Sequence, residues 1–169
     1  GLHGPLIIDE IEAPDVDEDL VLVLDDWRLD SAAQITSDFD NRHDMSHAGR
    51  IGNVVTTNGE MDWRRRVARG SRLRLRLINA ANARIFQLGL DGLEGWIVAQ
   101  DGMPLSQPCP VDGPFRLAPA QRVDLIVDVT AETGGAGHIV QIDRNESFSQ
   151  VAFEVAGEGA RARRDTPRP

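Results

Sequence analysis

One stretch decides the fold class of this chain, Arg72-Leu-Arg-Leu-Arg-Leu77. In an extended strand successive side chains point to opposite faces, so the three leucines lie on one face and the three arginines on the other. Burial of each leucine contributes about 1.5 to 3 kcal/mol, which fixes the register of the strand. The stretch therefore predicts a strand with one face in a hydrophobic core.

The rest of the sequence repeats this period of two. Turn-forming residues separate the apolar runs, and Asn58-Gly59 is typical of a tight turn. We expect strands at residues 19–24, 51–57, 72–77, 84–90, 96–100, 115–117, 121–129, 138–142 and 151–155. Many short strands with little helical periodicity predict an all-β fold, an antiparallel sandwich or Greek-key barrel.

Length and composition limit the alternatives. We expect a single domain over residues 1–156, with residues 1–14 leading into it, and a flexible linker or tail over residues 157–169. Residues 31–49 are polar and predict a loop with one helical turn at most. The net charge of −9 argues against a general affinity for nucleic acid or anionic membranes, and no run reaches the roughly 20 apolar residues of a membrane span.

Six ordered motifs make the prediction more specific. They are Gly1-Leu-His-Gly-Pro-Leu-Ile-Ile8, Leu20-Val-Leu-Val-Leu-Asp-Asp-Trp27, Gly52-Asn53 with Asn58-Gly59, Leu75-Arg-Leu-Ile-Asn-Ala-Ala-Asn82, Gln100-Asp-Gly102 and Leu117-Ala-Pro-Ala-Gln-Arg-Val-Asp124. In this order they resemble the second, middle cupredoxin domain of three-domain, laccase-type multicopper oxidases. The resemblance covers residues 1–155 and implies a Greek-key β-sandwich of the cupredoxin type. The chain then reads as a piece of a longer polypeptide.

The resemblance also implies a role. In such oxidases the first and third domains hold the copper ions, which oxidise substrates one electron at a time and reduce dioxygen to water. The middle domain is a scaffold, so we expect this chain to be inactive alone and to have the first and third domains of the same polypeptide as its partners. Copper belongs to the parent protein, which is periplasmic or secreted by family resemblance. Apolar surface normally covered by those domains predicts self-association of the isolated chain.

Copper ligands can be looked for position by position. The third-domain pattern His-Pro-x-His-x-His-Gly, placed by its last glycine, falls on residues 86–92, which contain no histidine. The second ligand block, His-Cys-His, falls near residues 142–144, which contain neither histidine nor cysteine. We therefore expect no catalytic, cofactor-binding or metal-binding residue of the family type in this chain.

Other ligand candidates have simpler interpretations. Cys109 lies between prolines with no histidine beside it, which favours a free structural thiol in a loop over a blue-copper ligand. His43 and His47 are four residues apart, so a helix would place both imidazoles on one face, as in zinc sites. This pair remains the alternative metal site. We expect His3 to be a surface or domain-contact residue and His138 to be partly buried.

Seven arginines lie between residues 64 and 76 and form a local basic patch. Such a patch suits phosphate or RNA, but an acidic chain without interleaved exposed aromatics favours a solvated or domain-contacting sheet face. The glycine-rich residues 134–137 predict a hairpin turn, because no helix follows that could hold a phosphate.

Two functional hypotheses follow. In the first, the chain is the non-catalytic middle domain of a multicopper oxidase. In the second, the parent is a copper-free member of the same superfamily and acts as a structural or protein-binding component of the periplasmic, division-associated type. Copper ligands in the flanking sequence would distinguish the two.

Overall fold

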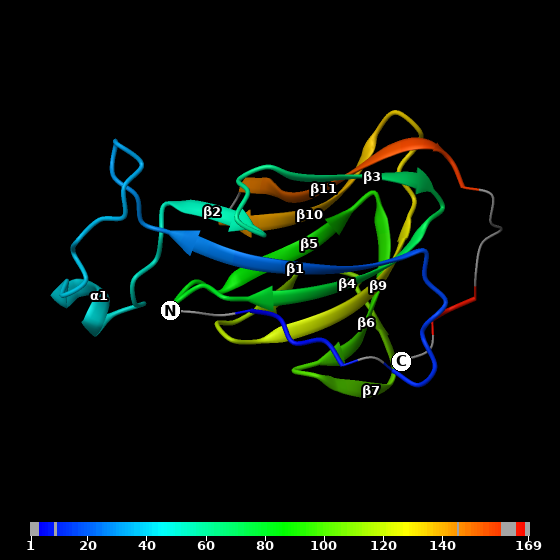
Figure 1. Cartoon of the computed structure of the whole chain (residues 1–169), viewed down its shortest axis with the longest axis horizontal. Helices are drawn as coiled ribbons and strands as arrows, with labels where there is room; N and C mark the ends of the chain where they lie inside the picture. Colours follow the sequence, from blue (N-terminus) through cyan, green and yellow to red (C-terminus); the bar gives the residue numbers. More distant parts are fainter. Residues whose placement is uncertain (1–3, 9, 145, 160–164, 168–169) are drawn as a thin grey trace.

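The computed structural model describes residues 4–8, 10–144, 146–159 and 165–167. Within these ranges it contains eleven strands and one short helix, and two sheets pack face to face around a common core (Figure 1). The predicted all-β sandwich is therefore confirmed. No helix among the described residues is long and apolar enough to cross a membrane.

The larger sheet has six strands. Their spatial order is β2 (Val54–Thr57), β1 (Glu18–Trp27), β4 (Arg72–Asn79), β9 (Arg122–Val129), β6 (Leu93–Gln100) and β7 (Met103–Pro110). The smaller sheet follows the order β3 (Trp63–Arg69), β11 (Glu146–Glu158), β10 (Ala136–Asp143), β5 (Phe86–Asp91) and β8 (Phe115–Leu117). Both sheets are mixed, since β1 pairs with β4 and β3 pairs with β11 in parallel. These two parallel pairs depart from the antiparallel sandwich that was one of the two expected forms.

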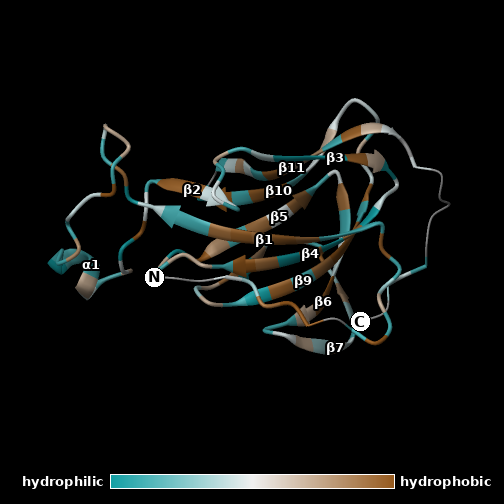
Figure 2. Cartoon of the chain, in the orientation of Figure 1, coloured by the Kyte–Doolittle hydropathy of each residue, from teal (hydrophilic) through white to brown (hydrophobic). Residues whose placement is uncertain are grey.

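The core lies where the alternating stretch predicted it. Leu73, Leu75 and Leu77 of β4 are fully buried, and Leu75 is paired in register with Leu125 of β9. The strands carry most of the hydrophobic residues of the chain (Figure 2). The arginines of β4 point to the opposite, outer face, which the charged residues Asp124 and Asp128 of β9 share.

Two strands were missed. β3 was not expected because its residues 63–69 are mostly arginine and show no apolar alternation; it lies at an edge of the smaller sheet, where one side needs no partner. β7 was not expected because it contains three prolines, which a sheet tolerates on an edge strand. Cys109 is an exposed residue of β7, so its expected place in a loop was wrong.

The turn expected at Asn58-Gly59 is present, and the hairpin turn expected at residues 134–137 is not. Asn58-Gly59 and Asp101-Gly102 both form turns in which each residue has positive φ, which asparagine, aspartate and glycine tolerate best. The glycine-rich residues 134–137 do not close a hairpin, because the flanking strands β9 and β10 belong to different sheets. β11 continues to Glu158, two residues into the segment expected to be a linker.

An insert over residues 28–53 separates β1 from β2 and projects from the sandwich (Figure 1). It contains the expected helical turn, α1 (Arg42–Ser46), capped at its start by the Asn41 side chain. Arg28 forms ion pairs with Asp38 at 2.9 Å and Asp44 at 2.6 Å. Arg50 contacts Asp38 at 2.6 Å. These charged contacts give the insert a defined conformation in place of apolar packing.

Candidate functional site

The two blocks that would carry copper ligands lie next to each other. β5, which contains residues 86–91, pairs with β10, and Val140 stands opposite Gly89 in the register. A Cβ atom added at Gly89 would lie 3.4 Å from methyl groups of Val140 and Ile142. Aliphatic side chains therefore pack around Gly89, and this environment does not fit copper, which needs imidazole and thiolate donors. Among the described residues no group of three or more His, Cys, Asp or Glu could hold a metal ion.

The alternative metal pair is partly assembled. His43 and His47 lie on and directly after α1, both exposed, with their rings stacked at a centroid distance of 4.2 Å. Nδ1 of His47 lies 3.0 Å from the carbonyl oxygen of His43. The neighbouring Asp44 carboxylate is engaged by Arg28. Two imidazoles thus share one face, fewer than the three or four protein ligands of a zinc site.

One further histidine, His138, lies within the described residues. His138 is half-buried and its Nδ1 lies 2.8 Å from the hydroxyl of Ser149, in agreement with the sequence prediction. His3 lies outside the described residues.

The basic patch splits between the two sheets. Each of its seven arginines contacts at least one carboxylate, so none presents an unpaired charge. On β3 the pairs are Arg64–Asp62, Arg64–Glu154, Arg65–Glu18, Arg66–Glu154 and Arg69–Glu132, in which every arginine side chain is exposed. On β4 they are Arg72–Asp128, Arg74–Glu10, Arg74–Asp124 and Arg76–Asp19. Exposed pairs of the β3 kind contribute little stability.

Arg72 and Arg74 of β4 are buried within the chain itself, which the expectation of a solvated or domain-contacting sheet face did not include. Their side chains are only 4% and 7% exposed. Arg72 donates from Nε and Nη2 to the two carboxylate oxygens of Asp128, at 2.6 and 2.7 Å. Its Nη1 donates to the backbone carbonyl oxygen of Asp165 at 2.7 Å. The hydrogen bonds with Asp128 raise the pKa of Arg72 although burial opposes this.

Arg74 joins the sheet to the start of the chain. It donates to both carboxylate oxygens of Glu10, at 2.6 and 2.8 Å, and to Asp124 at 2.7 and 3.2 Å. Burial lowers the pKa of Arg74, but the hydrogen bonds to Glu10 and Asp124 outweigh it and raise the pKa above its usual value. The same contact with Arg74 lowers the pKa of Glu10.

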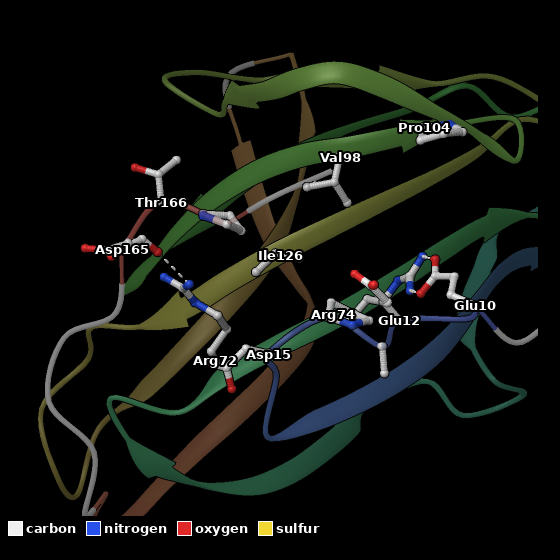
Figure 3. A pocket seen from close by; sticks show the side chains of 13 residues that line it. Glu10, Glu12, Asp15, Arg72, Arg74, Val98, Pro104, Ile126, Asp165 and Thr166 are labelled. Atoms are coloured by element: carbon white, nitrogen blue, oxygen red, sulfur yellow. Dashed lines mark hydrogen bonds and ion pairs between the residues drawn. The ribbon is translucent and has the colours of Figure 1, made fainter.

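A cavity of about 820 Å³ lies above these arginines (Figure 3). One wall is residues 10–15, which we name the N-terminal strap, and another is residues 165–167, which we name the C-terminal segment. Val98, Pro104 and Ile126 add apolar surface. Sequence reasoning missed this arrangement. The available signal was that Asp124 and Asp128 are four residues apart on β9, the same spacing as Arg72 and Arg76, which stand opposite them on β4.

Comparisons with known proteins agree with the fold and with the motifs. The sequence matches the multicopper oxidase family over residues 18–151. Laccase-1 of Thanatephorus cucumeris is 28% identical over 78% of this chain and 25% of its own length. The cell division protein FtsP of Edwardsiella tarda is 33% identical over 83% of this chain and 26% of its own length.

Solved structures give the same picture. The multicopper oxidase of Pseudomonas thermotolerans superposes with a TM-score of 0.86 at 27% identity, over 100% of this chain and 39% of its own. Lac15 from a marine microbial metagenome superposes with a TM-score of 0.77 at 34% identity, over 96% of this chain and 39% of its own. The chain thus spans between a quarter and two fifths of the length of these relatives. It belongs to the multicopper oxidase family.

Proposed function

We propose that this chain is the non-catalytic middle domain of a three-domain multicopper oxidase. Its partners are then the first and third cupredoxin domains of the same polypeptide, which carry the copper that oxidises substrates and reduces dioxygen. The observation that carries the proposal is an intact sandwich in which residues 86–92 and 142–144 contain no histidine or cysteine and in which Val140 and Ile142 pack around Gly89. The share of the relatives' length that the chain covers supports a domain within a longer protein.

The exposed apolar side chains support contacts with neighbouring domains. Leu6, Ile8 and Ile11, on and just before the N-terminal strap, are 86%, 78% and 105% exposed. Phe39 and Met45 of the insert are 69% and 77% exposed. Aliphatic and aromatic surface of this kind marks places where a protein meets another surface. In the isolated chain the same surface favours self-association.

A second function is favoured by one observation. FtsP of Edwardsiella tarda, a cell division protein, is as similar to this chain as the laccases are. The alternative is therefore a copper-free parent in which this domain has a structural or protein-binding role. Sequencing the complete reading frame separates the two: His-x-His pairs before the domain and a His-Cys-His block after it support the oxidase, and their replacement supports the alternative.

Copper titration of the purified chain tests the absence of a resident site. We expect no blue absorption and no stoichiometric copper in the electron paramagnetic resonance spectrum, because residues 86–92 and 142–144, where the family ligands fall, contain neither histidine nor cysteine. The double variant His43→Gln/His47→Gln is the control, since any weak binding to the exposed pair disappears with it. A blue one-to-one site that survives in this variant would contradict the proposal.

A further inference from the structure

Arg72 and Arg74 connect two parts of the chain that are far apart in sequence. Arg74 binds Glu10, 64 residues away, and Arg72 binds the carbonyl of Asp165, 93 residues away. Residues two apart on a strand point to the same face, about 7 Å from each other. The N-terminal strap and the C-terminal segment therefore meet on neighbouring positions of the outer face of β4 (Figure 3).

These contacts differ from ordinary surface ion pairs. Both guanidinium groups are almost completely buried. Arg74 binds the Glu10 carboxylate through two nitrogens, whereas Arg72 binds Asp128 of β9 in this way and uses only Nη1 for the carbonyl of Asp165. Bidentate, charge-assisted hydrogen bonds of this kind fix the orientation of both groups. The chain is also held just after the strap, because Asp17 N donates to the carbonyl of Arg72 and the Asp17 carboxylate accepts from Arg72 N.

The cavity between the two segments does not itself present a ligand site. Arg72 and Arg74 already donate to Asp128, Asp165, Glu10 and Asp124, so they offer no vacant bidentate face to an anion. In the C-terminal segment, which lines the other side of the cavity, the Pro167 side chain is buried. The two arginines therefore serve to hold the N-terminal strap and the C-terminal segment.

We propose that Arg72 and Arg74 form a clasp that holds the N-terminal strap and the C-terminal segment side by side on the outer face of the six-stranded sheet. The role of the clasp in the whole protein rests on the proposed function. In a three-domain protein, the clasp anchors the polypeptide that arrives from the first domain next to the polypeptide that leaves for the third. The middle domain would then set the direction of both neighbours through two side chains of one strand.

Electron paramagnetic resonance distances between two nitroxide labels test the clasp in the chain as it stands. One label goes on the native, exposed Cys109 and the other on Ile11→Cys, whose parent side chain is fully exposed. We expect a single narrow distance, and loss of this narrow peak in Glu10→Gln, which cannot form the ion pair with Arg74. Glu12→Gln is the matched control, because Glu12 lies on the same strap and makes no hydrogen bond or ion pair with the described residues. Its narrow peak is expected to remain.

The second half of the clasp is tested with labels on Cys109 and Thr166→Cys. Arg72→Lys keeps a positive charge beside Asp128 but loses the Nη1 donor, so the narrow distance to position 166 is expected to broaden. If this variant does not fold, Arg72→Gln replaces it, since glutamine also lacks the Nη1 donor to Asp165. Narrow peaks that persist in Glu10→Gln, or in the folded position-166 variants, would overturn the clasp. Copper ligands in the flanking sequence report on the proposed function separately, so either idea can fail alone.

Discussion

At the scale of single residues, Asn79 shows how one buried polar side chain joins several elements. It is 1% exposed at the end of β4. Its amide nitrogen donates to the carbonyl oxygens of Arg84 and Leu117, each at 2.8 Å, and its side-chain oxygen accepts from Ala81 N at 2.9 Å. The sequence marked this asparagine as part of a family motif, but its three partners depend on the tertiary fold.

Replacing Asn79 therefore carries a defined cost. Asn79→Ala leaves buried carbonyl groups without donors, and we expect the free energy of unfolding to fall by about 2 to 4 kcal/mol. Asn82→Ala, at an exposed position of the same motif, is expected to change it by less than about 0.5 kcal/mol. Urea unfolding of both variants measures the difference. Equal effects at the two positions would contradict this role of Asn79.

At the scale of elements, the accuracy of sequence reasoning depended on which force forms each segment. Strands with one apolar face, such as β4 and β9, can be predicted from the sequence. The hydrophobic effect requires an apolar residue at every second position of such a strand. The edge strands β3 and β7 need only one hydrogen-bonded neighbour, so arginine and proline are tolerated there and the pattern is absent. In the insert before β2 a different force acts, since ion pairs give this segment its defined conformation.

The insert can be tested at its central cation. Arg28 donates to Asp38, to Asp44 and to the carbonyl of Ile51, so Arg28→Gln removes the contacts that join both ends of the insert. We expect faster backbone amide exchange over residues 30–50 while the sandwich remains protected. Arg42→Gln, an exposed position on α1, is the control and is expected to leave exchange unchanged. Unchanged exchange in Arg28→Gln would mean that other contacts hold the insert.

At the scale of the whole molecule, many of the contacts that sequence reasoning missed are ion pairs and charged hydrogen bonds. The chain carries 27 acidic side chains and 18 arginines, and the contacts between them connect regions that no local pattern relates. The fold class was predictable because periodicity is local. The clasp was not, because Glu10 and Asp165 are 64 and 93 residues from the arginines that bind them.

The same contacts predict how stability depends on pH. The pKa of Glu10 is lowered by its hydrogen bonds to Arg74, and Arg28 lowers the pKa of Asp44 in the same way. A carboxyl whose pKa is lower in the folded chain stabilises it above the unfolded value, about 3.9 for aspartate and 4.3 for glutamate, and loses this contribution as pH falls through the folded value. Stability is therefore expected to be constant near neutral pH and to fall in the acid range.

Comparison with Glu10→Gln isolates one of these groups. Glu10 faces Arg74, with Arg76 and Asp19 also close enough to affect its charge. We expect urea unfolding to show the variant less stable than the wild type at neutral pH and the gap to close once Glu10 is protonated. A gap that stays constant across the acid range would show that the Glu10 charge does not contribute.

The prolines of β7 have a consequence for how the protein behaves at high concentration. This strand is an open border of the six-stranded sheet, and Pro104, Pro108 and Pro110 have no N–H to donate. A foreign strand approaching this border would find gaps in the row of donors that it needs for pairing. The chain is thereby protected against amyloid-like stacking along this edge, whatever association its apolar side chains bring about elsewhere.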